Sequence, residues 1–262
     1  MSPRALLLTV VCAVAAPAGA DGALVLFGGG ERPPRALQRF VEWAGGKAAR
    51  LLVVTWASAS PEESFDGVRE DLAPLAPASI EMAPLAPLGP EARERFLALL
   101  RDATGVFFGG GDQARIMDAL RDPELLRAVR ERHRAGVVFG GTSAGTAAMS
   151  RVMITGEGDF KVIDAAKVAT REGLGLIPGV ILDQHFIRRQ RENRLFALIL
   201  ANPGELGVGV DEDAALLVEG GRKAEVVGGS VMIVDGRKER GALRIRVLKA
   251  GQRYDLRERR LE

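Results

Sequence analysis

The sequence predicts an α/β fold, in which one domain holds a mostly parallel central sheet flanked by helices, with extra antiparallel strands at its C-terminal end. Two observations predict this fold. From residue 23 onward, apolar runs alternate with helical stretches through short connections, which is the pattern of parallel βαβ units. The apolar runs also lack alternation with polar residues, as expected of strands buried on both faces. The length of 262 residues suffices for a single large domain of this kind.

The first half of the chain supplies the parallel units. Apolar runs predict strands at 23–30, 49–58, 79–85, 104–111 and 136–141. Helices are expected at 33–43, 61–72, 90–101, 113–120 and 123–134, and Ser60 is expected to cap the second of them. Residues 73–90 contain "PLAP" twice and are interpreted as loops that flank one strand, not as a domain linker.

The second half of the chain is expected to add the antiparallel strands. A buried strand is predicted at 179–186, a helix from about 187 to 201, and a further apolar strand at 206–210. Short strands near 224–227, 230–234 and 243–248 then complete the C-terminal end of the sheet.

The N-terminal segment differs from the rest of the chain. Arg4 is followed by an apolar run and then by small residues up to Ala20, which is the pattern of a secretory signal peptide cut after Ala20. A membrane anchor is the weaker alternative, because a spanning helix needs about 20 apolar residues. We therefore expect a signal peptide at 1–20, a domain at 21–262, and a bacterial protein exported to the periplasm or the medium without stable membrane association.

Composition narrows the chemistry further. Cys12 is the only cysteine, so the chain without its signal has none, which excludes disulfides, a thiol nucleophile and thiolate zinc sites. A lipid anchor on Cys12 is disfavoured because Val10 and Val11 are bulkier than such sites usually allow. The formal net charge of +2 is small, so it does not indicate nucleic acid as a partner.

A serine lies at a glycine-rich bend within "VVFGGTSAGTAAM" at 137–149. Residues 141–145 fit G-x-S-x-G, the pattern of a nucleophile elbow, in which the serine takes a strained conformation between a strand and a helix. The N–H of Ala144 would then stabilise an oxyanion. Ligands bind at the carboxyl ends of strands in open α/β sheets, so Ser143 should lie at the functional edge. An incidental serine in a glycine-rich turn is the alternative.

A serine nucleophile needs a base, and the chain has two histidines. His133 lies at the charged end of a predicted helix and is interpreted as solvated. His185 directly follows an apolar strand, at the same edge as Ser143, and is the candidate base. The orienting carboxylate has several candidates, among which spacing alone does not choose. They are Glu157, Asp159, Asp183, Asp211, Glu212 and Asp213.

Other chemistries fail on specific residues. Gly109, Gly111 and Ala114 give a loose dinucleotide-binding pattern, but its third position is not glycine and the ribose-binding acid is ambiguous. No glycine loop continues into the lysine and hydroxyl residue of a P-loop. Two distant histidines and no cysteine in the exported chain argue against zinc, so we expect neither a metal nor a cofactor. An ordinary α/β-hydrolase would place its histidine last, which this chain does not do.

Four motifs occur in order from residue 107 to residue 215, and together they closely resemble the cyanophycinases among the S51 serine peptidases, which also include aspartyl dipeptidase. The motifs are "FFGGGDQ", "GGTSAG", "GLGLIPGVILDQHFIRRQRENRL" and "GVGVDEDAA". The resemblance implies a fold of the class I glutamine amidotransferase-like or flavodoxin-like type. The implied triad is Ser143, His185 and Glu212. The implied oxyanion site is formed by Gly110, Gly111 and Ala144.

The resemblance also implies a substrate, cyanophycin, which is a polymer of aspartate whose side chains carry arginine and which is cut to β-aspartyl-arginine. The residues at the matching substrate-binding positions are Gln113, Asp183, Gln184, Arg189, Arg191 and Arg194. Arginines can pair with substrate carboxylates, whereas aspartate and glutamine can accept from its guanidinium groups. On the expected helix, Arg188, Arg191 and Arg194 would share one side. The charge of Glu212 should raise the pKa of His185 from its ordinary value of about 6.5 to near 7.

One segment departs from the family pattern. Residues 155–168, "TGEGDFKVIDAAKV", carry Lys161 where a glutamate is expected, so peptidase chemistry is more firmly implied than cyanophycin as the substrate. Two other functions therefore stay open: a dipeptidase of the same family with another substrate, and a non-catalytic binding protein on the same scaffold. Association into a homodimer also stays open.

Overall fold

The computed structural model describes residues 22–159 and 161–262. The predicted signal peptide at 1–20, including Cys12, lies outside these residues. Within the described ranges, no helix combines the length and the apolar composition that crossing a membrane requires.

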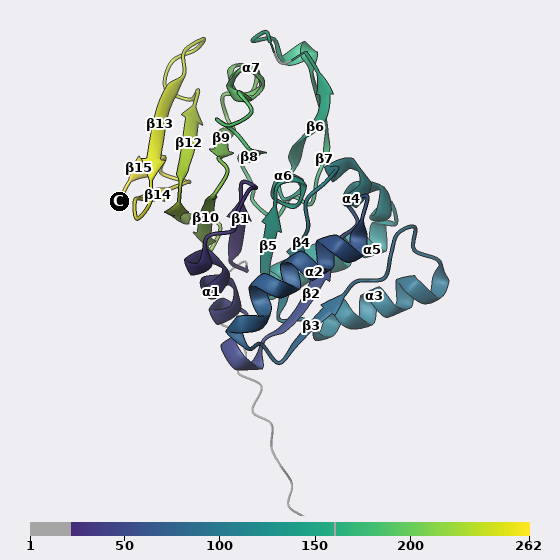
Figure 1. The fold of residues 1–262 in the computed structure, drawn as a ribbon. Helices are drawn as coiled ribbons and strands as arrows, with labels where there is room; N and C mark the ends of the chain where they lie inside the picture. The colour runs from purple at the N-terminus through teal and green to yellow at the C-terminus, as the bar shows by residue number, and fades with distance from the viewer. Residues whose placement is uncertain (1–21, 160) are drawn as a thin grey trace, which may run out of the picture.

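The first half of the chain forms the parallel part of a nine-stranded sheet at the centre of the molecule (Figure 1). Its strands are β1 (Leu24–Phe27), β2 (Arg50–Val54), β3 (Ser79–Met82), β4 (Gly105–Phe108) and β5 (Val138–Thr142). They lie in the order β1-β5-β4-β2-β3, with every neighbouring pair parallel. Apart from β3 and Arg50 their residues are buried, which explains the apolar runs without alternation.

The antiparallel part of this sheet comes from the C-terminal half. Its strands are β10 (Ala214–Glu219), β11 (Lys223–Gly228), β14 (Arg253–Asp255) and β15 (Arg260–Leu261). β10 pairs with β1 in antiparallel register, with Ala215 opposite Phe27. The residues that precede β10 therefore lie at the carboxyl end of β1, which is the edge where ligands bind in open α/β sheets.

Helices cover both faces of the nine-stranded sheet. The helices are α1 (Pro34–Trp43), α2 (Pro61–Leu72), α3 (Pro90–Asp102), α4 (Gln113–Ala119), α5 (Pro123–Arg134) and α6 (Ala144–Ala148). Short 3₁₀ helices lie at Gly46–Ala48, Ala73–Leu75 and Ala165–Lys167. Neighbours in β4 show the two layers: Phe107 packs with α1 and α2, whereas Phe108 packs with α3 to α6.

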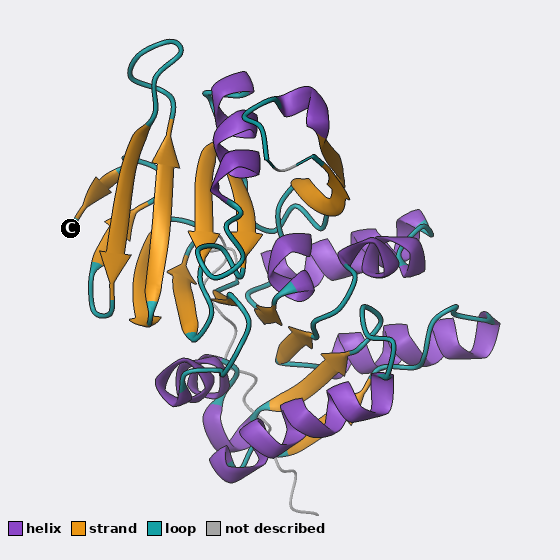
Figure 2. Cartoon of the chain, turned by 45° about the horizontal axis from the view of Figure 1, so that its top comes forward, coloured by secondary structure: helices purple, strands orange, loops and turns teal. Residues whose placement is uncertain are grey.

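A second, four-stranded sheet stands beside the helix-covered half of the molecule (Figure 2). Its strands are β8 (Val180–Gln184), β9 (Leu206–Val210), β12 (Ser230–Asp235) and β13 (Arg244–Lys249), in the order β13-β12-β9-β8. Helix α7 (Glu192–Ala201) packs against it, and a two-stranded hairpin of β6 (Val152–Gly158) and β7 (Val168–Glu172) rises on the other side of α7 (Figure 1).

The predicted single α/β domain with added antiparallel strands is confirmed, and most predicted elements lie within a few residues of the observed ones. Several details differ, and the hairpin strands β6 and β7 were not predicted. The helix after His185 begins at Glu192 and not near residue 187. Ser60 precedes α2 but makes no side-chain capping hydrogen bond. β8 and β9, and also β12 and β13, which were expected to complete the central sheet, belong to the separate sheet, because an apolar run predicts a strand but does not specify the strand beside it.

Candidate active site

Ser143 lies between β5 and α6 with φ 53° and ψ −113°, a backbone conformation that residues other than glycine rarely adopt. The neighbouring glycines are required by space. A Cβ at Gly141 would lie 2.6 Å from the carbonyl carbon of Gly145, and one at Gly145 would lie 2.2 Å from the carbonyl oxygen of Phe108. The strand, the sharp turn and the helix agree with the elbow that the sequence predicts.

His185 directly follows β8 and reaches Ser143 from the second sheet. Its Nε2 lies 2.9 Å from Oγ of Ser143. Its backbone N–H donates to the carbonyl of Gly28 at 2.8 Å. Gly29 lies against the ring, because a Cβ there would be 2.2 Å from Cε1 of the imidazole. The glycine run after β1 therefore leaves the space that the ring occupies, a role that was not predicted from the sequence.

Glu212 is the carboxylate that contacts the imidazole. Its Oε1 lies 2.6 Å from Nδ1 of His185. Glu212 belongs to the short link between β9 and β10, where the chain passes from the second sheet to the first. Two sheets and the link between them therefore supply Ser143, His185 and Glu212.

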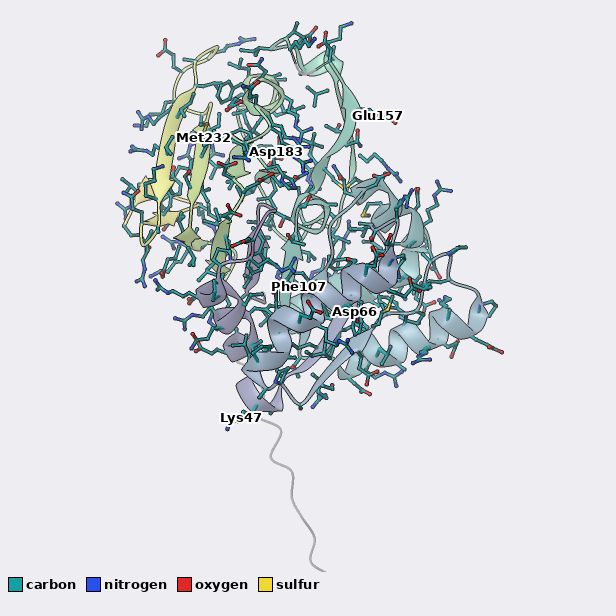
Figure 3. The ribbon with its side chains drawn as sticks, in the orientation of Figure 1. Lys47, Asp66, Phe107, Glu157, Asp183 and Met232 are labelled. Carbon is teal, nitrogen blue, oxygen red and sulfur yellow. The ribbon has the colours of Figure 1, made fainter. Side chains whose placement is uncertain are left out.

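The other candidate acids occupy different positions. Asp183 pairs with an arginine in the interior, and Asp211 and Asp213 accept hydrogen bonds from backbone N–H groups. Glu157 lies on β6 of the projecting hairpin, and Asp159 follows that strand (Figure 3). The geometry thus separates acids that spacing in the sequence could not separate.

The hydrogen-bond partners of the imidazole fix its preferred tautomer. Burial lowers the pKa of His185 below its ordinary value, and the hydrogen bond to Glu212 opposes this effect. Burial is the larger effect, so the expectation that the pKa of His185 rises toward 7 is not supported. With Nδ1–H donating to Glu212, the neutral ring presents Nε2 as an acceptor to the Ser143 hydroxyl. Such an array can remove the serine proton during attack on a carbonyl carbon.

The glycine run after β4 lies beside the serine. A Cβ at Gly110 would lie 3.4 Å from Cβ of Ser143. Gly111 has φ 132°, and a Cβ there would lie 2.1 Å from the carbonyl oxygen of Ala57. Ala144, the first residue of α6, follows the serine directly. The structure therefore brings Gly110 and Ala144 against Ser143, while their function as an oxyanion site, with Gly111, stays a prediction.

Three predicted substrate-binding residues, Gln113, Gln184 and Arg191, are wholly or largely buried. Oε1 of Gln184 lies 3.4 Å from Oγ of Ser143. Arg191 donates from Nη1 to the carbonyl of Gln184 at 2.9 Å, and burial together with nearby Arg194 lowers its pKa to about 10. Gln113 donates from Nε2 to the backbone carbonyl of residue 154 at 2.7 Å. Arg191 still carries its charge at neutral pH, so it adds a cation beside the site.

Two arginines in the turn after His185 are exposed. The side chain of Arg189 is 53% exposed, and its Nε lies 3.8 Å from Oε1 of Glu212. Arg188 is more exposed still, with its Nε 3.9 Å from Oε2 of the same glutamate. Of the predicted substrate-binding cations, Arg189 is therefore the one most accessible to a ligand.

Asp183 and Arg194 form an ion pair beneath the site. Nε of Arg194 donates to Oδ2 of Asp183 at 2.6 Å, and Nη2 donates to Oδ1. Their side chains are only 1% and 2% exposed, and Figure 3 shows Asp183 in the interior beside α7. A substrate cannot contact these groups without displacing the structure above them, so their geometry differs from that expected of substrate ligands.

Arg188, Arg191 and Arg194 were expected to share one side of a helix. The structure contradicts this expectation, because α7 begins only at Glu192. Residues 186–190 form turns, and Arg191 is the residue at the N-terminal end of α7. The carboxylate of Asp211 accepts from the N–H groups of Ile187 and Arg188, and Gln190 has φ 52°. These contacts hold the segment in a turn, which delays the helix.

The interpretation of His133 as solvated is wrong. His133 is 3% exposed and packs edge-on against Phe139, with ring centroids 5.6 Å apart. The charged neighbours of His133 in the sequence suggested a surface position, but the inner side of α5 carries this ring onto β5.

Comparison with known proteins places this arrangement in a family. The model of Peptidase family S51 matches residues 24–226. The chain belongs to peptidase family S51. As an S51 peptidase it is a serine-type hydrolase. It is 34% identical over 224 residues to a cyanophycinase of Synechococcus elongatus, covering 84% of this chain and 70% of that protein.

Two further comparisons agree with this assignment. A cyanophycinase of Geminocystis herdmanii is 35% identical over 202 residues, which cover 76% of this S51 peptidase and 74% of the relative. The crystal structure of a peptidase from an acI-B1 actinobacterium superposes with a TM-score of 0.71 at 23% identity, covering 91% of this chain and 98% of that one. The structural likeness supports the fold alone.

Proposed function

We propose that this S51 peptidase hydrolyses aspartyl peptide bonds. Its proposed substrate is cyanophycin, and the proposed products are β-aspartyl-arginine dipeptides. The observation that carries the proposal is the continuous array from Oγ of Ser143 through His185 to Glu212, with distances of 2.9 and 2.6 Å. Relatives named cyanophycinase, 34% and 35% identical over most of the chain, favour this substrate. If residues 1–20 act as an export signal, the enzyme degrades polymer outside the cytoplasm.

The proposed reaction begins with attack of Ser143 Oγ on the scissile carbonyl carbon, while Nε2 of His185 takes the hydroxyl proton. Glu212 stabilises the imidazolium that forms. In this proposal the backbone N–H groups of Gly110, Gly111 and Ala144 stabilise the oxyanion. The imidazolium then returns its proton to the leaving amine, and water attacks the acyl-serine by the same route and frees the second product.

Substrate charge favours binding at this edge. Each unit of the polymer carries the guanidinium group and the free α-carboxylate of its arginine, so it presents both signs of charge. Arg189 and Arg191 supply cations near the serine, and Gln184 supplies an amide oxygen that can accept from a guanidinium. We assign Asp183 and Arg194 a supporting part, because both are buried.

The proposal is tested by incubating the purified protein with insoluble cyanophycin and, separately, with the β-aspartyl-arginine dipeptide, and by identifying the products by mass spectrometry. We expect the polymer to yield dipeptides and the dipeptide to stay intact. Ser143→Ala serves as the control for a contaminating peptidase. Cleavage of the dipeptide without cleavage of the polymer would show the second candidate, an S51 dipeptidase.

One observation favours that second candidate. Lys161 lies beyond the end of β6, on the projecting hairpin, where the family resemblance leads us to expect a glutamate. The Shewanella amazonensis protein named peptidase E is 30% identical over 129 residues, which cover 46% of this chain. Comparing Lys161→Glu with the unchanged protein on both substrates measures what the hairpin contributes to the choice.

A further inference from the structure

Three consecutive acids, Asp211, Glu212 and Asp213, form the whole link between β9 and β10. The link joins the two sheets at the edge where the site lies. Only the middle acid contacts the imidazole. The carboxylates on either side make contacts with the two backbone segments that flank the ring.

Asp211 holds the segment that follows the imidazole. Its Oδ1 accepts from the N–H of Ile187 at 3.0 Å and from the N–H of Arg188 at 2.9 Å. Its own backbone N–H donates to the carbonyl of Ser230 at 3.1 Å, which fixes the link to the second sheet. This carboxylate therefore anchors the turn that follows His185 to the link.

Asp213 holds the segment on the other side. Its Oδ1 accepts from the N–H of Glu31 at 2.7 Å, and its backbone N–H donates to the carbonyl of Gly29 at 3.0 Å. Asp213 itself has φ 56°, a left-handed conformation that is uncommon outside glycine, although aspartate adopts it more readily than most residues. The glycine run after β1 is thus attached to the link at two points.

The segment that Asp213 holds is the one that touches the ring. The backbone of Gly29 lies so close to His185 that a Cβ would be 2.2 to 2.7 Å from three ring atoms. The imidazole is therefore enclosed between the glycine run and the turn after it, and each of these carries a hydrogen bond to an acid of the link.

We propose that Asp211 and Asp213 are positioning residues that set the imidazole of His185 on the line between Ser143 and Glu212. This inference rests on the proposed function, because the line matters only if the three residues perform the hydrolysis. The hydrogen bonds, and not the charges, carry the effect, since each carboxylate accepts from backbone N–H groups. A displacement of about 1 Å in such an array is enough to lower turnover by about 100-fold.

The test compares alanine with asparagine at both positions. Asp211→Ala and Asp213→Ala remove the acceptor, and we expect kcat to fall about 10- to 100-fold with KM unchanged. Asp211→Asn and Asp213→Asn keep an oxygen that accepts, so kcat should stay within about threefold of the unchanged enzyme.

A control with similar backbone hydrogen bonds is available in the C-terminal segment, where the carboxylate of Asp255 also pairs with Arg222. Oδ1 of Asp255 also accepts from two consecutive backbone N–H groups, those of Arg257 and Glu258, at 3.0 and 2.8 Å. β14, which contains Asp255, is separated from β1 by β11 and β10. Asp255→Ala should lower the free energy of unfolding without lowering kcat. Equal loss of kcat in all three alanine variants, or in the asparagine and alanine variants, overturns the inference.

A readout without substrate separates this inference from the proposed function. The Nδ1 proton of His185, held against Glu212, should give a low-field proton NMR signal that is assigned by its absence from His185→Gln. We expect the signal in the unchanged protein, both asparagine variants and Asp255→Ala, and its loss in Asp211→Ala and Asp213→Ala. If the signal is unchanged in the last two, the acids do not position the ring. If the signals behave as expected but cyanophycin is not cut, the proposed function fails and the positioning stands.

Discussion

Near the end of β8, two acidic side chains each pair with a basic side chain, and the two pairs differ in solvent exposure. Asp183 and Arg194 are 1% and 2% exposed and bind each other through two hydrogen bonds. Glu212 and His185 are 24% and 9% exposed, and His185 has Ser143 as a second partner. The first pair is enclosed and satisfied, whereas the second opens onto a nucleophile.

The difference shows how neighbouring pairs in one region can act on stability and on chemistry separately. A buried ion pair gives up the solvation of both charges, so removing one partner leaves the other uncompensated. A carboxylate beside an imidazole that still reaches solvent can instead stabilise a charge that appears only during a reaction. Substitutions in the two pairs should therefore affect different measurements.

The largest expected effect is on turnover at the pair that contacts Ser143. Ser143→Ala and His185→Ala should each lower kcat by about 10⁶-fold, and the double variant should lose little more, because residues that act as a unit have non-additive effects. Thermal unfolding should change little. Losses that multiply in the double variant would show that the two residues act independently and not as one catalytic unit.

The next effect is on stability at the enclosed pair. Arg194→Leu should lower the free energy of unfolding by about 3–5 kcal/mol, because it leaves the Asp183 carboxylate buried without its partner. Urea denaturation measures this change. The double variant Asp183→Leu, Arg194→Leu should be more stable than Arg194→Leu alone. A stable Arg194→Leu protein with impaired substrate binding would instead restore the substrate-binding prediction.

A smaller effect is expected at Arg191, which lies between the two pairs. Its Nη1 is 4.0 Å from Oδ1 of Asp183, and its side chain is 19% exposed. Arg191→Ala should lower kcat/KM on cyanophycin. The loss of transition-state stabilisation should be about 1.5–3 kcal/mol, the range for a charge-assisted contact. Hydrolysis of a neutral ester, where detectable, serves as the control. Equal losses on both substrates would assign Arg191 to the structure of the site and not to substrate recognition.

The smallest effects are shifts in pH dependence. Hydrolysis needs a neutral imidazole, so kcat/KM should rise with pH through the pKa of His185, at a midpoint below its ordinary value of about 6.5. Glu212→Gln should move the midpoint lower, because that carboxylate raises the pKa. Arg189→Ala should move it higher, because the arginine lowers the pKa. Shifts in the opposite directions would contradict this account of the ring's environment.

The sequence predicted the parts of the fold that depend on local pattern. Buried parallel strands read as apolar runs, and proline marked the starts of α2 and α5 at the predicted residues. The partners of a strand depend on contacts far along the chain, so the second sheet and the place of β10 beside β1 were not predicted. The turn after His185 also depends on a distant group, the carboxylate of Asp211.

The candidate site was predicted unevenly for a similar reason. The glycines around Ser143 are needed to avoid clashes within a few residues, so their spacing is visible in the sequence. The chain has only two histidines, so there were few candidates for the base. The choice of Glu212 came from the family resemblance. The sequence does not distinguish Asp211, Glu212 and Asp213, because only the fold determines which of their carboxylates contacts His185. The burial of Asp183 and Arg194 had no signal in the sequence, since both residue types are usually exposed.

Covalent labelling tests the central claim, that His185 activates Ser143, most directly and without assuming a substrate. The purified protein is treated with a fluorophosphonate, and the modified residue is located by peptide mass spectrometry. We predict one label per chain, on Ser143, with labelling strongly slowed in His185→Ala and absent in Ser143→Ala. Labelling of Ser143 at an equal rate in the unchanged protein and in His185→Ala would contradict the claim.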